Sequence, residues 1–591
     1  MATEDSVEPC HELPSIASDW REGIKKRYLR AEQLLTETKD APTQPYKSKY
    51  EARELLRELV DWLRSVSDER IEGVPFSQDE INAMLVRVLA MVANVDSEVE
   101  EPASAEKNLN KALSLLDFES CDSLSVTGAL HVLNQLGLLW SMREDHERAL
   151  GYLQKAENLY GSFVSSNVEP LDTKSFFTGS TDGSGQNELE LLYTHTLYFL
   201  AQVFKALKMN EKAALYCHAT LKKQLERGRD YNKIEWAINA ATLSQYLAER
   251  YAFKEARHHL AAAEYVMQAE RAAFQDIPDD SDEHAKLRET LEYRGSDVAR
   301  CWVKYCLLLF CASRERLMGS DEDSQPRNTE PPKELIGLGF PSLDVKEYEN
   351  VSASYVLDYD DAKKVFLFAQ KCCNSALEYN TLDGHVTDHV IICQDLSKLF
   401  EFLAFYDDNE DNQSKMHKRR IDLLSKVVTA LNSQYYLELC RSLWLELGSI
   451  CLTMAEIKLS KLNSSNRPEP KLVTKCNTIL QNGVDHVEKY IRSYDDMKTQ
   501  GPPLRYPDEV AKEVISAHLL AANMYLKFVS ADGVKLLYYN TKSLDLFKYV
   551  VEYCERNSDF KELEGELHLA KQMELLLPAK LSRISARIND D

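Results

Sequence analysis

Two pairs of histidines in the sequence have spacings that could serve metal binding. His385 and His389 are four residues apart, so one helical turn would bring their rings together, and His258 and His259 are adjacent. A zinc site needs at least three protein ligands, and neither pair has a cysteine or another third ligand at close spacing. We therefore interpret both pairs as structural histidines and predict neither a metal site nor a cofactor.

The sequence lacks the signatures of common enzyme classes. It contains no GxxxxGK[ST] phosphate loop, no GxGxxG, no HExxH and no GxSxG. Cys301, Cys306 and Cys311 follow one another at intervals of five residues, which spreads them around a helix and indicates small buried side chains. No pair of acidic residues stands out as a catalytic dyad. These observations predict a protein that is not an enzyme.

The charge balance favours a protein partner with a basic surface. The 95 acidic residues outnumber the 71 basic ones, which gives a net charge of −24. Nucleic-acid-binding proteins normally present a basic stripe, so we expect no nucleic-acid partner. The basic run at 415–420 (KMHKRR) could be a nuclear signal, but we favour a solvated helix start.

Several features predict a cytoplasmic location. The cysteine count, 13, is odd, which is untypical of a secreted disulfide framework. The N-terminal segment is acidic and lacks the apolar core of a secretion signal. The most apolar run, at 305–312, is too short to cross a bilayer, so we expect no membrane insertion.

The composition predicts a mostly helical chain, and one segment shows how its helices pair. Only 20 glycines and 18 prolines occur in 591 residues. In the segment 129–160, Leu136 and Gly137 are followed by the aromatic Trp140, and Ala149 stands twelve positions after the glycine. This is the spacing of the tetratricopeptide (TPR) repeat. A small residue at the crossing of two helices lets their backbones approach, and larger residues fill the space beside it.

The same spacing recurs further along the chain. Ala201 is followed twelve positions later by Ala213, and Ser244 by Ala256, while a degenerate copy begins at 444–448 (WLELG). Three consecutive matches predict an all-α fold, a TPR-like α-solenoid of antiparallel helix pairs. We interpret the following residues as packing residues of these repeats: Leu136, Trp140, Ala149, Ala213 and Ala256.

Breaks in the helical pattern predict the domain organisation. The longest, at 318–345, is acidic and contains four prolines. We expect a disordered N-terminus at 1–19, an N-terminal TPR-like subdomain at 20–317, an acidic proline-rich linker at 318–355 and a C-terminal TPR-like subdomain at 356–591.

In a solenoid, the concave face is formed by the first helix of each pair, on the side away from the second helix. Amides and aromatic side chains there suit the recognition of a peptide or a helix. Counting from the small residue of each repeat gives these candidates: His131, Asn134, Leu138 and Ser141; then His195, Tyr198, Gln202 and Lys205; then Ile238, Ala241 and Gln245.

Several long blocks go beyond generic repeat spacing. They occur at 45–56 (PYKSKYEARELL), 193–207 (YTHTLYFLAQVFKAL), 211–226 (EKAALYCHATLKKQLE), 234–247 (IEWAINAATLSQYL), 299–307 (ARCWVKYCL), 383–390 (DGHVTDHV) and 415–424 (KMHKRRIDLL). In these blocks the chain strongly resembles the kinesin family binding proteins, from about residue 45 to its C-terminal segments. The first 40 residues and the 318–345 loop diverge from the family.

The resemblance implies a right-handed solenoid of two subdomains that binds kinesin motor domains and competes with microtubules for them. It implies roles in kinesin-driven transport, axonal microtubule organisation, axon outgrowth and neuronal development, with indirect microtubule association. Family contact residues carry over onto Gln202, Gln224 and Thr242, while Phe199 replaces an expected tyrosine. The candidate partner-binding residues are therefore His195, Tyr198, Phe199, Gln202, Gln224, Thr242 and Gln245.

A generic TPR scaffold or co-chaperone that binds a peptide on its concave face is the alternative. Clamps of that kind hold a terminal carboxylate with lysine and arginine on the concave helices. Among the candidate positions only Lys205 is basic, so the sequence favours the kinesin-binding hypothesis.

Overall fold

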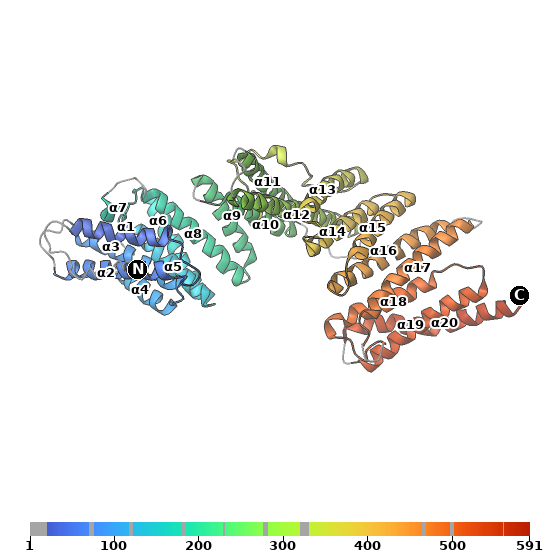
Figure 1. Ribbon diagram of the computed structural model, residues 1–591. Helices are drawn as coiled ribbons and strands as arrows, with labels where there is room; N and C mark the ends of the chain where they lie inside the picture. The colour runs from blue at the N-terminus through green and yellow to red at the C-terminus, as the bar shows by residue number, and fades with distance from the viewer. Residues whose placement is uncertain are drawn as a thin grey trace, which may run out of the picture. The chain divides into compact units, whose positions relative to one another are not determined.

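The structure is a computed structural model that describes residues 20–69, 76–117, 122–179, 185–228, 231–275, 282–319, 330–463, 469–496, 501–558 and 561–590. Over these residues it contains twenty α-helices, three short 3-10 helices and no strand apart from an isolated bridge between Asp496 and Gly501. The predicted all-α fold is confirmed (Figure 1). The predicted disordered segment 1–19 lies outside the described residues.

The chain divides into two compact units, Met1–Asn232 (unit 1) and Lys233–Asp591 (unit 2). The helices of unit 1 are α1 (Trp20–Thr36), α2 (Lys47–Glu69), α3 (Gln78–Glu98), α4 (Pro102–Ser114), α5 (Val126–Met142), α6 (His146–Ser165), α7 (Ser175–Thr178), α8 (Gly185–Ala206) and α9 (Asn210–Arg227).

The α-helices of unit 2 are α10 (Lys233–Glu249), α11 (Phe253–Gln275), α12 (Asp282–Met318), α13 (Tyr359–Tyr379), α14 (Val386–Phe405), α15 (Glu410–Ala430), α16 (Leu437–Asn463), α17 (Pro470–Arg492), α18 (Asp508–Leu526), α19 (Gly533–Arg556) and α20 (Glu564–Asp590). Its 3-10 helices are η1 (Lys333–Leu335), η2 (Lys346–Tyr348) and η3 (Lys561–Leu563).

Local sequence signals set several helix ends. Ser77 and Glu80 form a reciprocal capping box at the start of α3, and the side chain of Asn409 accepts hydrogen bonds from two backbone N–H groups at the start of α15. Helix α9 ends at Gly228, whose φ of 68° is a left-handed conformation that glycine adopts at little cost.

Within each unit, consecutive helices pack as hairpins, and the hairpins stack on one another. In unit 1, α5 packs on α6 and α8 on α9, while α5 also contacts α8. In unit 2, α10 packs on α11 and α16 on α17, while α10 contacts α12 and α16 contacts α18. This arrangement is consistent with a solenoid, because each helix pair buries its apolar faces against its neighbours.

The repeat residues pack largely as the spacing predicts. Leu136, Ala149 and Ala256 are fully buried, whereas Trp140 and Ala213 are half-buried. A Cβ atom at Gly137 would lie 2.6 Å from side-chain carbons of Leu153 on α6, which explains why the smallest residue stands at this crossing.

Residues 330–358, which include most of the described part of the predicted linker at 318–355, pack against the helices of unit 2. The backbone N–H of Phe340 donates to His258 Nε2 (3.0 Å), and Arg257 forms an ion pair with Glu349 (2.7 Å). The apolar side chains of this segment that are buried are Leu335, Phe340, Val345, Val351 and Val356. Residues 320–329 lie outside the described residues.

The division after Asn232 differs from the predicted boundary at 318–355. Proline and acidic residues in that stretch suggest a linker, but its apolar residues give it a place in the core of unit 2. The division between the units instead falls between α9, which ends at Arg227, and α10, which begins at Lys233.

The two histidine pairs have structural partners. His258 Nδ1 lies 3.1 Å from Glu349, and His389 Nδ1 lies 2.8 Å from the carbonyl oxygen of Asn380. Within the described ranges, no group of three or more histidine, cysteine, aspartate or glutamate residues could hold a metal ion. Burial raises the pKa of the thiols of Cys301 and Cys311, and that of Cys306 further.

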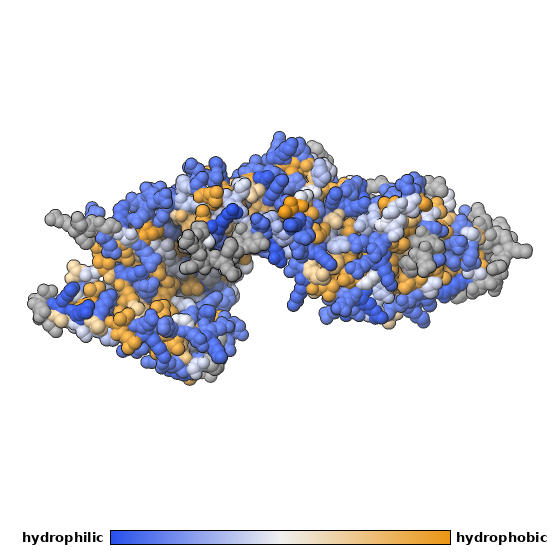
Figure 2. All heavy atoms as spheres, turned by 180° about the vertical axis from the view of Figure 1, so that it is seen from behind, coloured by the Kyte–Doolittle hydropathy of each residue, from blue (hydrophilic) through white to orange (hydrophobic). Residues whose placement is uncertain are grey.

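No helix in the described part of the chain is both long and apolar enough to span a membrane. The space-filling view shows hydrophilic side chains over much of the visible face, with hydrophobic side chains between them (Figure 2).

Candidate protein-binding surfaces

Helix α8 presents a polar stripe opposite its buried face. Its apolar side chains, among them Leu197 and Leu200, are buried. The stripe is a row of exposed residues at helical spacing, three or four positions apart, as expected for the polar side of an amphipathic helix. We call it the α8 stripe: His195, Tyr198, Gln202 and Lys205.

The side chains of the α8 stripe are not consumed by internal contacts. Tyr198 is 46% exposed, and Gln202 makes no hydrogen bond with another described residue. The half-buried Phe199 lies beside them, with its ring centroid 5.7 Å from that of Tyr198 and 6.2 Å from that of His195. Its position at the edge of the core fits an apolar contact better than a hydroxyl-mediated one.

Gln224 lies on the neighbouring helix α9. It is half-buried, and its side chain makes no hydrogen bond within the described part of the chain. The preceding residue, Lys223, forms an ion pair with Glu190 on α8 (2.7 Å). The pair fixes α9 against α8, and with it the position of Gln224.

A tyrosine pair that sequence reasoning missed supports the N-terminal half of α8. The rings of Tyr160 on α6 and Tyr193 on α8 are stacked with centroids 3.5 Å apart, and the hydroxyl of Tyr160 donates to Glu190 (3.0 Å). Desolvation, together with Glu157 nearby, raises the pKa of Tyr193 to about 12. Tyrosines 33 residues apart give no sequence signal of this contact.

No residue of the first candidate row, on α5, is exposed, since Asn134 is buried and His131, Leu138 and Ser141 are half-buried. His131 on α5 lies within electrostatic range of His195 on α8. Desolvation, with Arg87 nearby, lowers the pKa of His131 to about 4 and keeps its ring neutral. Partial desolvation of its ring and, to a smaller extent, Arg227 lower the pKa of His195, although its side chain is still exposed.

The prediction that Asn134 belongs to an exposed face is wrong. Its side chain is 3% exposed, donates to the carbonyl oxygen of Leu192 (2.8 Å) and accepts from the hydroxyl of Thr196 (2.8 Å). Asn134 therefore ties α5 to α8. A buried amide must find partners, and the carbonyl of Leu192 and the hydroxyl of Thr196 provide them.

The remaining two candidates lie on α10 in unit 2. Thr242 is exposed, whereas Gln245 is half-buried and its amide donates to the carbonyl oxygen of Cys301 on α12 (3.1 Å). Ala241, also expected on the concave face, is buried. The seven candidates are thus divided between α8 and α9 of unit 1 and α10 of unit 2.

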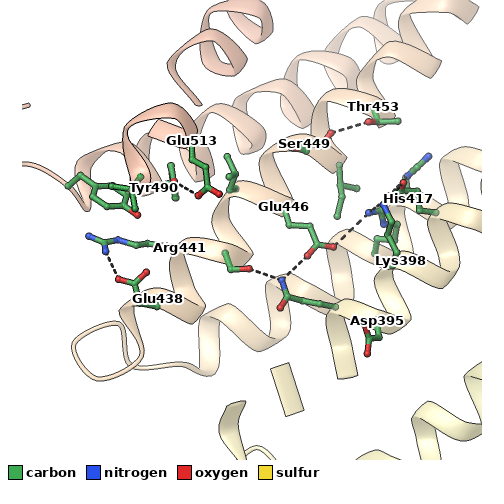
Figure 3. A pocket seen from close by; sticks show the side chains of 18 residues that line it. Asp395, Lys398, His417, Glu438, Arg441, Glu446, Ser449, Thr453, Tyr490 and Glu513 are labelled. Atoms are coloured by element: carbon green, nitrogen blue, oxygen red, sulfur yellow. Dashed lines mark hydrogen bonds and ion pairs between the residues drawn. The ribbon is translucent and has the colours of Figure 1, made fainter. Parts of the chain in front are cut away.

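Unit 2 contains a second polar surface that sequence reasoning did not find. A groove with a volume of about 930 Å³ is lined by residues of α14 to α18 (Figure 3). We call it the polar groove. Its charged and imidazole-bearing residues are Asp395, Lys398, Glu401, His417, Arg420, Glu438, Arg441, Glu446 and Glu513.

The basic run at 415–420 contributes two of these residues, and the prediction that it is a solvated helix start is partly wrong. Lys415, Lys418 and Arg419 are exposed, but His417 and Arg420 are each only 5% exposed. Every third or fourth residue of a helix faces inward, so a basic run can have a buried side. The inward positions here meet the acidic residues of α14 and α16.

Arg420 is the centre of that contact. Its guanidinium forms ion pairs with Glu401 on α14 (2.9 Å) and Glu446 on α16 (3.7 Å), and its Nε donates to Ser397 (3.0 Å). Glu446 also accepts from Gln394 (3.0 Å) and Ser397 (2.7 Å). The network joins three helices around the groove.

The stacked helix hairpins are consistent with an α-solenoid. Residues 234–584 match the model of the family described as "KIF-1 binding protein C terminal". The chain is 34% identical to the KIF-binding protein of Danio rerio, over 96% of this chain and 98% of that protein. It is 33% identical to the human KIF-binding protein, over 93% and 96% respectively.

A solved structure agrees with the sequence comparisons. The chain in the structure titled "Cryo-EM map of KIFBP" superposes with a TM-score of 0.62 at 29% sequence identity, covering 97% of this chain and all of that one. This chain belongs to the KIF-binding protein family.

Proposed function

We propose that this protein binds kinesin motor domains and thereby prevents them from binding microtubules. The observation that carries the proposal is the α8 stripe, a row of exposed side chains without structural duties, in a chain of the KIF-binding protein family. The proposed contact residues are those of the sequence analysis: His195, Tyr198, Phe199, Gln202, Gln224, Thr242 and Gln245.

The chemistry of the stripe supports recognition of a helix or loop of the motor. The amide of Gln202 can both donate and accept, and Tyr198 offers an aromatic surface with a hydroxyl at its end. A motor's microtubule-binding surface is basic, because the microtubule that it meets is acidic. The net charge of −24 then steers the encounter, while the polar contacts set the register.

The proposed role is regulatory and non-enzymatic. The protein acts in the cytoplasm in association with the cytoskeleton and controls kinesin-driven transport, axonal microtubule organisation and axon outgrowth. Its association with microtubules is indirect, through the motor.

Microtubule co-sedimentation of a kinesin motor domain tests the proposal. The motor should pellet alone and stay in the supernatant when this protein is added. Gln202→Ala combined with Tyr198→Ala should restore pelleting, whereas Gln154→Ala should not. Gln154 is an exposed glutamine on α6 and serves as the matched control. A ternary pellet of motor, microtubule and this protein at ordinary salt would refute competition.

Association kinetics separate the two contributions. Raising the salt concentration should slow association, because exposed charges are screened beyond about 8–10 Å. Replacing Gln202, Gln224 and Thr242 together by alanine should speed dissociation and leave the salt dependence unchanged. Equal salt dependence of association and dissociation would contradict this division of roles.

A further inference from the structure

The basic side chains in the walls of the polar groove are already paired with other groups of the protein. Lys398 pairs with Glu401 (2.8 Å), Arg420 pairs with Glu401, and Arg441 lies over the ring of Tyr494 at 3.7 Å. Arg441 also donates through Nε to Ser493 (2.8 Å) and forms an ion pair with Glu438. The three cations of the groove are thus neutralised by the protein's own groups, and they do not call for an anionic ligand.

One hydrogen-bond donor in the wall of the groove has no acceptor among the described residues. His417 Nδ1 lies 3.3 Å from Arg420 Nη1, and a guanidinium can only donate, so Nδ1 accepts. Desolvation and Arg420 lower the pKa of His417 to about 4, so the ring is neutral and its single proton sits on Nε2. This N–H has no partner within the described part of the chain, on a side chain that is 5% exposed and lines the groove.

One carboxylate in the wall of the groove also has no bonded partner among the described residues. Asp395 on α14 is half-buried and makes neither a hydrogen bond nor an ion pair with another described residue. Figure 3 places it apart from the cluster around Glu446. Lys304 and, to a smaller extent, Arg300 on α12 act on it electrostatically without bonding to it, and the guanidinium of Arg300 pairs instead with Asp388 (2.8 Å). A half-buried carboxylate without a donor is costly, and a cation would complete it.

We propose that the polar groove binds a peptide segment of a partner protein that carries lysine or arginine. The cationic side chain meets the carboxylate of Asp395, and a main-chain carbonyl accepts from His417 Nε2. Five carboxylates against three cations give the groove the charge that complements such a segment. The proposal goes beyond the proposed motor contact, because it assigns a second site on other helices.

Fluorescence anisotropy with the full-length chain tests the proposal. The probe is a fluorescein-labelled peptide with lysine at every third position, separated by glycine and alanine, and the same peptide with glutamine or glutamate replaces lysine as a control. The lysine peptide should bind, and the two control peptides should not. Failure of the lysine peptide to bind the unmodified protein overturns the proposal.

Two substitutions test whether the carboxylate of Asp395 contacts the peptide. Asp395→Asn should weaken binding about tenfold, because it removes one partner of a partly desolvated charge pair. Asp545→Asn, at an exposed aspartate of α19, removes the same charge elsewhere and should leave binding unchanged. Equal weakening by both variants would show attraction by net charge alone and overturn the site.

A matched pair of substitutions tests whether the N–H at His417 Nε2 donates to the peptide. His417→Asn keeps an acceptor near the position of Nδ1 for Arg420 but loses the N–H at Nε2, so binding should weaken. His417→Gln places an N–H near Nε2 and should retain more of the binding. Melting temperatures show which variants fold. Free spermidine carries cations but no carbonyl, so competition by spermidine as strong as by unlabelled peptide would overturn the proposed peptide contact.

Discussion

The α8 stripe of unit 1 and the polar groove of unit 2 offer polar side chains in opposite ways. The stripe residues are exposed, and Gln202 is bonded to no described residue. Most charged residues of the groove are buried or half-buried, although Glu438 and Glu513 are exposed, and most of them pair with one another, as Arg420 does with Glu401 and Glu446. A polar surface can therefore be free for a partner or be part of the fold, and only burial and bonding tell the two apart.

The comparison has an energetic consequence. Exposed polar residues contribute little to the free energy of unfolding, so they can be replaced at little structural cost. Buried ion pairs are costly to form and still more costly to break, because one partner is then left uncompensated. Substitutions in the groove should therefore change stability, and substitutions in the stripe should change binding alone.

The largest effect is expected at the centre of the groove. Arg420→Ala should lower the free energy of unfolding by about 3 kcal/mol, because Glu446 loses its cation and Glu401 keeps only Lys398 and Arg314. Urea unfolding followed by circular dichroism measures the change. Arg419→Ala, at the exposed neighbour on α15, should cost less than about 1 kcal/mol. Equal losses would mean that Arg420 contributes no more than a surface charge.

The next effect has the opposite sign and depends on pH. Desolvation raises the pKa of Asp395 from 3.8 to about 6, with Glu446 adding to the shift and Lys304 and Arg300 opposing it. The charged form is thus the costly one, and its cost is full above pH 6 and vanishes as the pH falls towards 4.

Asp395→Asn removes that cost at every pH. The free energy of unfolding should rise by up to about 3 kcal/mol at pH 7.5, and the gain should disappear by pH 4. Urea unfolding at both pH values measures it. A gain that persists at pH 4, or no gain at pH 7.5, would contradict the account of Asp395 as an uncompensated carboxylate.

The sequence predicted the repeats and the stripe because both follow from spacing along one helix or one hairpin. Ala149 and Ala256, the small residues twelve positions along each repeat, are buried, and Gln202, which was counted from such a residue, is exposed. The polar groove depends on contacts between side chains about 20 to 50 positions apart, such as Arg420 with Glu401 and Gln394 with Ser442. Spacing along the chain carries no signal of such pairs.

The predicted linker and Asn134 show where prediction from a local sequence pattern fails. Proline and charge marked residues 318–355 as a boundary, but tertiary packing gives residues 330–358 a place in unit 2. Asn134 has the right phase for an exposed face, yet the neighbouring helix α8 covers it. In both cases a local pattern was overridden by the position of another helix.

A smaller loss of stability is expected where unit 1 has one buried polar group. Asn134→Ala should lower the free energy of unfolding by about 1–3 kcal/mol, because it removes two hydrogen bonds and leaves a buried carbonyl and hydroxyl with fewer partners. Asn187→Ala, at an exposed asparagine in the first turn of α8, is the control and should change stability by less than about 0.5 kcal/mol. Equal losses of stability in the two variants would show that Asn134 contributes no more to stability than an exposed asparagine does.

The smallest structural effect is expected at Gln202, and it is the sharpest test of the comparison. Gln202 is exposed on α8 and unbonded within the described chain, and alanine is a slightly better helix former than glutamine. Gln202→Ala should therefore leave the free energy of unfolding within about 0.5 kcal/mol of the original while it weakens binding of the motor domain. Urea unfolding and motor binding of the same preparation measure both quantities. A loss of stability as large as that of Asn134→Ala would show that Gln202 holds the fold, and the stripe would then be a structural surface like the groove walls.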